Sequence, residues 1–397
     1  MARLSAQLVV ASLGVALAQP PTQAGQAAAI PDFPLSAVET GMTGYALTAG
    51  PGDVIERFPV EVVSVQFDAV PGLDLVLIRV SGPFIVASGG VAAGMSGSPV
   101  YLLGEAAPGL LGAIGYVFPS ADHHLALVTP IQAMRDELTA GGSPATVDVP
   151  GYGRAVAVAT PIVLTGASDR AASLIATLFR DGSVSPFPVQ AGGAGQRTPS
   201  DFALVPGAAV AVQLMSGAVE LSAVGTVTSV EGTRLLAFGH PFLGYGSVSY
   251  GLAPAHITAI VPSAIVPFKL ANVGAGSLGA ITLDAPAAVA GLIGTTPDTV
   301  PLTITLDTGQ RQEVFELALA ADERLYPTLT AIATLQLVDR LLRVTSAGHA
   351  DLAWEIELGG GGRLNMLEQV DSSGDVALAA ARLAGGPLAI LATNAFQ

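Results

Sequence analysis

The residues best suited to chemistry stand together in the segment Gly94-Met95-Ser96-Gly97-Ser98-Pro99. A serine in a tight turn bounded by glycines projects its hydroxyl, and the amides of Gly94 and Ser96 can point together as an oxyanion hole. This pattern predicts Ser96 as a nucleophile, with an ordinary Gly/Ser turn as the alternative. The G-x-S-x-G nucleophile elbow is excluded, because residue 98 is Ser where that motif requires Gly.

A serine nucleophile needs a general base, and the chain contains five histidines. His240 directly follows Phe238-Gly239 at the end of a predicted strand and precedes Pro241, a setting typical of a fixed base. We therefore predict His240 as the base, with a plain turn histidine as the alternative. The other four lack such a setting, and they are His123, His124, His256 and His349.

The elements that must position these residues are mostly strands. Apolar residues alternate with a period of two, and Gly or Pro interrupts them about every 8–12 residues, which favours barrels or sandwiches. The pattern predicts strands over 56–67, 73–80, 100–103, 110–118 and 125–128, a helix starting near residue 129, a hairpin of 221–229 with 233–238, and a strand over 280–284. From about residue 296, strands over 300–307 and 312–320 and an apolar helix near 325–342 predict a separate module.

Several of these motifs together resemble the SpoIVB-type serine peptidase family over roughly residues 38–293. The resemblance is carried by Gly41–Tyr45, by Gly94–Pro99, by the A-V-G-T-V-T strand Ala223–Thr228 and by the A-F-G-H turn Ala237–His240. It implies a trypsin-like double β-barrel peptidase with Ser96 as nucleophile and His240 as base. The chain departs from that family in order, because here Ser96 precedes His240, and it shows no clear PDZ segment.

The order of the motifs indicates a circular permutation, in which Asp74 and His240 share one barrel and Ser96 lies in the other. In trypsin-like chains the orienting Asp begins a strand of the form D-[IL]-x-L-[LI]-[KR], and Asp74–Arg79 reads D-L-V-L-I-R. Asp74 is therefore predicted to hold the imidazole, with a plain strand-start residue as the alternative. Asp284 is the second candidate acid.

The N-terminus reads as an export signal. Arg3, an apolar stretch over 4–15 and Ala16-Leu17-Ala18 form the three parts of a signal peptide cut after Ala18, with a first core helix as the alternative. Outside this segment no apolar run is long enough to span a membrane. The net charge of −15 makes nucleic acid and anionic membranes poor partners. The absence of cysteine excludes disulfides and thiolate chemistry.

No cofactor or metal is expected. The G-x-G-x-x-G pattern at 274–279 leads into a strand rather than a helix, and Asp122-His123-His124 lacks a third ligand. The predicted fold class is mainly β, with a trypsin-like double β-barrel core and a smaller C-terminal α+β module. The predicted divisions are a signal peptide at 1–18, a linker at 19–35, a Ser-bearing part at 36–145, a His-bearing part at 146–293 and the module at 294–397.

The predicted function follows from these parts. The chain is expected to be a secreted or periplasmic serine endopeptidase acting on protein or peptide substrates, with Ser96, His240 and Asp74 as the catalytic residues and Gly94 and Ser96 as the oxyanion hole. The alternative is a catalytically inactive, peptidase-like envelope or scaffold protein. The sequence leaves the substrate and the oligomeric state undetermined.

Overall fold

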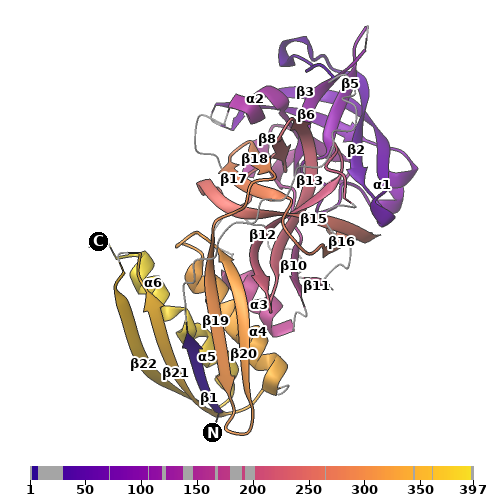
Figure 1. Ribbon diagram of the computed structural model, residues 1–397. Helices are drawn as coiled ribbons and strands as arrows, with labels where there is room; N and C mark the ends of the chain where they lie inside the picture. The colour runs from indigo at the N-terminus through magenta and orange to yellow at the C-terminus, as the bar shows by residue number, and fades with distance from the viewer. Residues whose placement is uncertain are drawn as a thin grey trace.

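The computed structural model describes residues 2–7, 30–70, 72–105, 107–118, 122–136, 146–165, 169–178, 190–192, 202–263, 265–342, 345–359 and 361–394. Within these ranges the chain is mainly β and forms two closed, six-stranded antiparallel barrels, followed by a C-terminal sheet covered by helices (Figure 1). The predicted fold class is confirmed: a mainly β, trypsin-like double barrel with a smaller C-terminal α+β module.

The first barrel is built from consecutive strands. They are β2 (Thr43–Ala49), β3 (Ile55–Val70), β4 (Leu73–Val80), β5 (Pro99–Leu103), β6 (Pro108–Val117) and β7 (Leu125–Pro130). The ring runs β5-β2-β3-β4-β7-β6 and closes where β6 pairs with β5. Short helices α1 (Pro83–Ser88) and α2 (Ile131–Asp136) and the single turns η1 (Leu35–Ala37) and η2 (Pro51–Asp53) accompany it.

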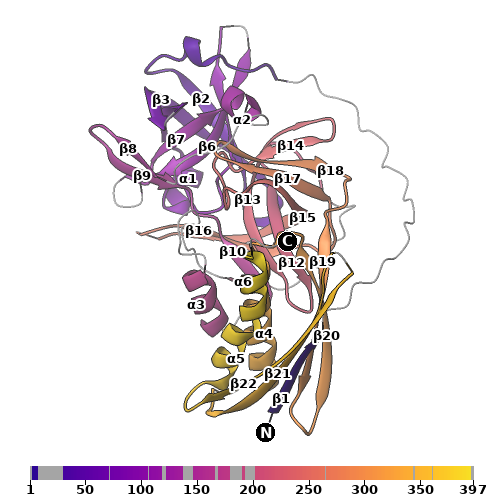
Figure 2. The same cartoon turned by 90° about the vertical axis from the view of Figure 1, so that its left-hand side faces the viewer.

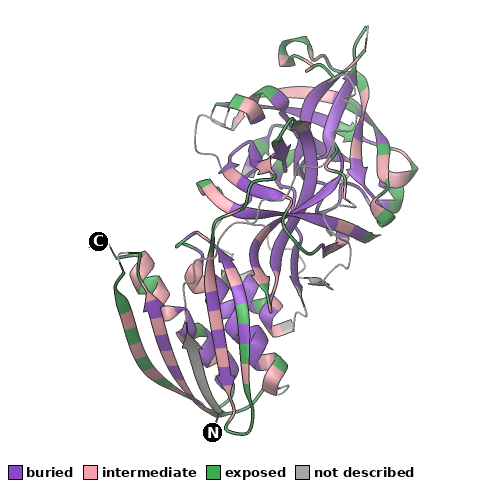
Figure 3. Ribbon diagram, in the orientation of Figure 1, coloured by how far each residue is buried: buried purple, intermediate pink, exposed green. Residues whose placement is uncertain are grey.

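Strand β4 shows why this barrel packs on both sides. Its sequence L-D-L-V-L-I-R-V is apolar on both faces, so Val76 and Ile78 enter the barrel interior while Leu75 and Leu77 point outward into a second apolar cluster. That second cluster also contains Leu236 from the other barrel. The two barrels therefore share an apolar interface of buried residues (Figure 3).

The second barrel follows later in the chain. Its strands are β12 (Ala209–Gly217), β13 (Leu221–Glu231), β14 (Arg234–Ala237), β15 (Gly246–Val261), β17 (Gly279–Ala285) and β18 (Ala288–Ile293). The ring β12-β13-β14-β18-β17-β15 closes where β15 pairs with β12. Strand β16 (Phe268–Val273) pairs with β15, while β10 (Ile162–Thr165) pairs with β13 and with β11 (Gln190–Gly192).

The C-terminal module is a sheet with helices on one face (Figure 2). The strand order is β20-β19-β1-β21-β22, with α4 and α5 packed against the sheet and α3 and α6 packed against α4. The bounds are β1 (Ala2–Gln7), β19 (Thr299–Asp307), β20 (Gln312–Ala320), β21 (Gly348–Glu357), β22 (Arg363–Ser372), α3 (Asp169–Leu178), α4 (Tyr326–Leu342), α5 (Val376–Ala384) and α6 (Gly386–Ala392). Because β20 also pairs with β12, this sheet is continuous with the second barrel.

The strand pairing bears on how the chain is divided and corrects the expected permutation. Strand β9 (Gly153–Ala157) pairs with β6 and β8 (Thr146–Val149) pairs with β9, so the sheet of the first barrel extends past residue 145. The expected permutation is wrong, because Asp74 and Ser96 both belong to the first barrel and His240 follows β14 of the second. Each barrel is a contiguous stretch of chain, so neither barrel is divided by a permutation.

The described residues include only part of the predicted signal peptide and linker. Ala2–Gln7 form β1, antiparallel to β19 and parallel to β21, while the expected cleavage site at 16–18 and most of the linker lie outside the described ranges. Among the described residues, no helix is both long enough and apolar enough to cross a membrane.

Candidate active site

The Ser96 turn rests on strand β13. The backbone N–H of Thr226 donates to the Ser96 carbonyl at 2.8 Å, and the hydroxyl of Thr226 donates to the Gly94 carbonyl at 2.9 Å. The Thr228 hydroxyl donates to the Gly97 carbonyl at 2.8 Å. Three carbonyls of the turn are thus held by the G-T-V-T strand. The two sequence motifs form one structural unit, although they lie far apart in the chain.

Gly97 allows this close approach. Its φ is +91°, and a β-carbon there would overlap the carbonyl oxygen of Thr226 and the amide nitrogen of Phe238. Only glycine adopts this conformation without strain and leaves room for the neighbouring backbone. The glycine that follows Ser96 therefore brings the nucleophile's turn against the corner that carries His240.

The corner before His240 is bent by two successive left-handed residues. Phe238 has φ +71° and Gly239 has φ +69°, and the left-handed region is unusual for a bulky residue such as Phe. The Thr129 hydroxyl from the first barrel donates to the Gly239 carbonyl at 2.6 Å and fixes the bend. Such strained backbone tends to cluster at functional sites. The bend carries the chain from the end of β14 into the interface between the barrels.

Ser96 and His240 lie in the same interface. The Gly97 amide donates to the Ile114 carbonyl at 2.9 Å, and a β-carbon on Gly239 would lie 3.2 Å from that same oxygen. The residues flanking the two predicted catalytic groups thus meet around one peptide of β6. Ser96 is fully buried, and His240 is 2% exposed.

The predicted direct hydrogen bond between Ser96 and His240 is not formed in this conformation. Within the described part of the chain, neither Ser96 Oγ nor His240 Nε2 has a hydrogen-bond partner, although both atoms are buried. Buried polar atoms without partners are uncommon and destabilising, and Ser98 Oγ of the same turn is another one among the described residues.

The second ring nitrogen of His240 is held by a backbone carbonyl instead of an acid. Nδ1 lies 2.7 Å from the Pro241 carbonyl oxygen, which can only accept, so this contact favours the tautomer with the proton on Nδ1 and the lone pair on Nε2. Burial lowers the pKa of His240 to about 4, and the carbonyls of Pro241 and Val158 offset only part of that effect. The imidazole is therefore neutral near pH 7, in the tautomer that a general base at Nε2 requires.

The predicted oxyanion hole is closed. The Gly94 amide donates to the Ala159 carbonyl at 3.0 Å, and the Val158 amide donates to the Gly115 carbonyl at 2.8 Å. Among the described residues, none accepts a hydrogen bond from the Ser96 amide. The connection between the two barrels thus occupies one of the two amides that an oxyanion would need.

Asp74 does not reach His240. Its carboxylate accepts a hydrogen bond from the Asp68 amide at 2.7 Å, beside the turn between β3 and β4. Since Nδ1 of His240 is held by Pro241, the predicted orienting role of Asp74 is not met in this structure. Its observed contact is that of a strand-start residue, the alternative interpretation of the D-L-V-L-I-R pattern.

Asp284, the second candidate acid, holds the loop that follows His240. Its carboxylate is 1% exposed and accepts from the amides of Phe242 at 2.7 Å, Leu243 at 2.6 Å and Gly244 at 2.9 Å. Burial raises the pKa of this carboxyl, and the backbone hydrogen bonds offset part of the increase. Among the described residues, Asp284 forms hydrogen bonds with this loop and none with the imidazole.

Replacing Asp284 by alanine should cost roughly 3 kcal/mol or more of unfolding free energy, because three buried amides would lose their acceptor. Asp284→Asn should cost less, since its amide oxygen can still accept. Asp74→Asn is the control at a half-buried carboxylate that accepts a single amide, and it should change stability by less than about 1 kcal/mol. Urea denaturation of the three variants checks this order, and equal losses for Asp74→Asn and Asp284→Ala would contradict it.

Sequence reasoning missed several residues of the site. The threonines of β13 were part of a motif, but their grip on the turn requires knowledge of which strands pair. The Val158–Ala159 contact involves backbone groups alone and leaves no signal in residue type. Lys269, described below, was recognisable only as the single lysine of the chain.

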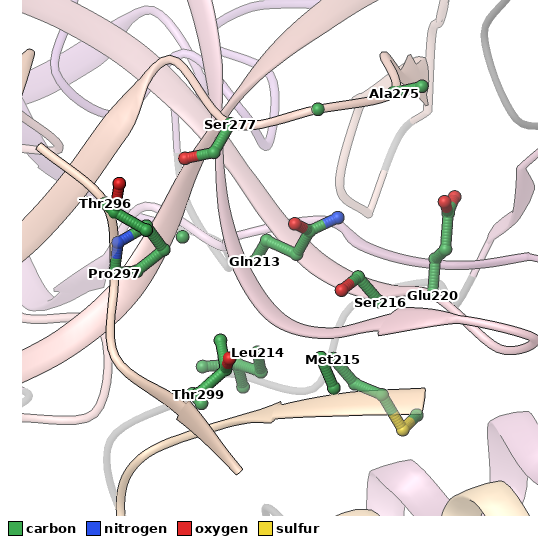
Figure 4. A pocket seen from close by; sticks show the side chains of 14 residues that line it. Gln213, Leu214, Met215, Ser216, Glu220, Ala275, Ser277, Thr296, Pro297 and Thr299 are labelled. Carbon is green, nitrogen blue, oxygen red and sulfur yellow. The ribbon is translucent and has the colours of Figure 1, made fainter. Parts of the chain in front are cut away.

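The pocket shown in Figure 4 belongs to a different part of the molecule. It has a volume of about 330 Å³ and lies beside β12 of the second barrel, where residues 275–277 and residues 296–299 form its other walls. Gln213, Ser216, Glu220 and Ser277 contribute polar groups to its wall. Of the described residues that line it, none belongs to the Ser96 turn or to the His240 corner.

No family model, no curated protein and no solved structure matched the chain.

Proposed function

We propose that the chain is a serine endopeptidase whose described conformation is closed. The observation that carries this proposal is the pair of buried atoms Ser96 Oγ and His240 Nε2, which have no hydrogen-bond partner among the described residues and lie on turns that meet at the interface of two closed barrels. The double-barrel fold is compatible with this chemistry, and the resemblance of the Ser and His motifs to SpoIVB-type peptidases supports it. The proposed substrate is a protein or peptide, and no cofactor is invoked.

The chemistry follows from the hydrogen-bonding roles of the groups. In the open site, Ser96 Oγ would attack the peptide carbonyl carbon and pass its proton to Nε2 of His240. The Pro241 carbonyl would keep the Nδ1 proton in place and orient the ring, the role that Asp was predicted to fill. The proton on Nε2 would then go to the leaving amine, and water would release the acyl group by the same path.

Opening is a necessary step of this proposal. The Gly94 amide must leave the Ala159 carbonyl before it can bind an oxyanion together with the Ser96 amide. Ser96 must also gain access to substrate, because it is fully buried. We therefore propose that residues 158–161, which connect the two barrels, move when substrate binds.

The alternative is a catalytically inactive, peptidase-like envelope or scaffold protein. The closed oxyanion site and the absence of an acid on His240 in the described residues favour it. In that case the interface would be a stable part of the core, and no condition would expose Ser96.

A fluorophosphonate probe separates the two proposals. Because the label is covalent, it accumulates even when the open conformation is a minor population, so incubation over hours is informative. We expect a single adduct on Ser96, located by peptide mass spectrometry and absent from Ser96→Ala. A chain that hydrolyses no peptide and takes no label on Ser96 would favour the scaffold.

We also propose that the protein is exported to the periplasm or the cell exterior and cut after Ala18. The three-part pattern of residues 1–18 supports this. N-terminal sequencing of the mature protein should begin at Gln19. Cleavage there would remove β1 and leave β19 and β21 without the strand between them. Recovery of intact Met1 in the cytoplasmic fraction would contradict export.

A further inference from the structure

Lys269 is the only lysine in the chain, and it is fully buried. It lies on β16, and its Nζ donates to the Thr48 hydroxyl of β2 at 2.7 Å and to the Thr226 hydroxyl of β13 at 3.5 Å. Thr48 belongs to the first barrel and Thr226 to the second. The amino group therefore links the two barrels directly behind the Ser96 turn.

The direction of the hydrogen bonds connects Lys269 to the turn. The Thr226 hydroxyl gives its proton to the Gly94 carbonyl at 2.9 Å, so toward Lys269 it can only accept. The backbone amide of Lys269 also donates to the Ala93 carbonyl at 3.0 Å. Side chain and main chain of Lys269 thus hold the two residues that lead into Met95 and Ser96.

The cost of burying its amino group indicates that Lys269 does not serve mainly to stabilise the fold. Burial lowers the pKa of Lys269 to about 7, which reflects the cost of desolvating the ammonium. An apolar side chain of similar volume would avoid that cost. Every other basic residue of the chain is arginine, yet lysine stands here, where a compact amino group rather than a planar fork meets two hydroxyls.

We infer that Lys269 is a positioning residue for Ser96, acting through the Thr226 hydroxyl to hold the Gly94 peptide and thereby the direction of the Ser96 hydroxyl. This inference rests on the proposed peptidase function. It assigns to β16 a part in the site that neither barrel motif contains. Its effect should appear in the reaction of Ser96 and not in substrate affinity.

The test uses the full-length protein and four variants. Lys269→Met keeps the volume and removes the donors, Thr226→Val removes the relay, and Thr226→Ser keeps the hydroxyl as the conservative rescue. We expect Lys269→Met and Thr226→Val each to lower the rate of fluorophosphonate labelling, by up to the order of 10²-fold, since small misplacements of a reacting group cost this much. The peptidase kcat should fall with KM unchanged, and Thr226→Ser should retain the wild-type rate.

The double variant Lys269→Met/Thr226→Val decides whether the two residues act as one path. If they do, it should be no slower than the slower single variant, whereas independent roles would multiply the losses. Multiplied losses, or labelling of Lys269→Met at the wild-type rate, would overturn the inference. Circular dichroism confirms that each variant is folded.

Hydrogen exchange of residues 91–99 gives a readout that needs no catalysis. Loosening of the turn should speed exchange there in Lys269→Met and Thr226→Val, and not in Thr226→Ser. If the wild type takes no label but Lys269→Met still speeds exchange, the peptidase proposal fails while the positioning role stands. If the wild type labels and both rate and exchange are unchanged in Lys269→Met, the positioning role fails alone.

Discussion

Alanine in place of Ser96 is expected to remove essentially all peptidase activity while the fold survives. Loss of a triad serine in comparable enzymes costs on the order of 10⁶ in kcat. Ser96 Oγ has no hydrogen-bond partner in the described chain, so its removal leaves no donor or acceptor unsatisfied. The unfolding free energy should therefore change by less than about 1 kcal/mol. Steady-state hydrolysis of a peptide substrate and urea denaturation of the same preparation measure the two effects.

Ser98 provides a closely matched control. It lies two residues away in the same turn, is also fully buried, and its hydroxyl likewise has no partner among the described residues. Ser98→Ala thus removes the same atom from the same surroundings. It should retain most of the activity. Equal losses in the two variants, or undiminished turnover in purified Ser96→Ala, would end the nucleophile assignment.

Local patterns predicted the elements well where burial dictates the residue types. The stretch 73–80 became β4 because both of its faces are covered, and the hairpin predicted near Glu231-Gly232 joins β13 to β14. The strands over 300–307 and 312–320 and the helix over 325–342 were also found close to the predicted bounds. The spacing of apolar residues shows which face of a strand or helix is buried. For these elements that local information was enough to predict their type and bounds.

The arrangement of those elements could not be predicted in the same way. Placing Asp74 with His240 relied on motif order and not on strand pairing, and the pairings put Asp74 and Ser96 in one barrel. The helices α5 and α6 were not anticipated, although α5 begins after an N-cap, Asp375, whose carboxylate accepts a hydrogen bond from the Leu378 amide. A strand's partner depends on long-range packing, which one sequence does not encode in any single segment.

The candidate site shows the same limit at the scale of single groups. Gly97 was foreseeable as a turn glycine, but its contact with Thr226 and Phe238 was not. The acid expected for His240 is replaced by the carbonyl of Pro241, and a backbone carbonyl is present at every residue. Residue types identified the nucleophile and the base as candidates, whereas the groups that orient them are partly main chain.

Stability should depend on His240 in the acid range. Burial lowers the pKa of His240 from 6.5 to about 4 in the folded state, so between these values the unfolded chain binds more protons than the folded one. The unfolding free energy therefore falls as the pH decreases from 6.5 to about 4. Above pH 6.5 the imidazole is neutral in both states, and this loss of stability is absent. A difference of this size corresponds to about 3 kcal/mol.

The difference between wild type and His240→Asn isolates this effect. Asn keeps a donor for the Pro241 carbonyl but does not titrate, and other groups such as Asp284 contribute equally to both proteins. Urea denaturation at intervals from pH 4 to pH 7 should show the wild type losing about 3 kcal/mol more than His240→Asn. Parallel curves would mean that the folded protein accepts the proton readily. The imidazole of His240 would then not be a desolvated base at the interface between the barrels. This result would also weaken the peptidase proposal.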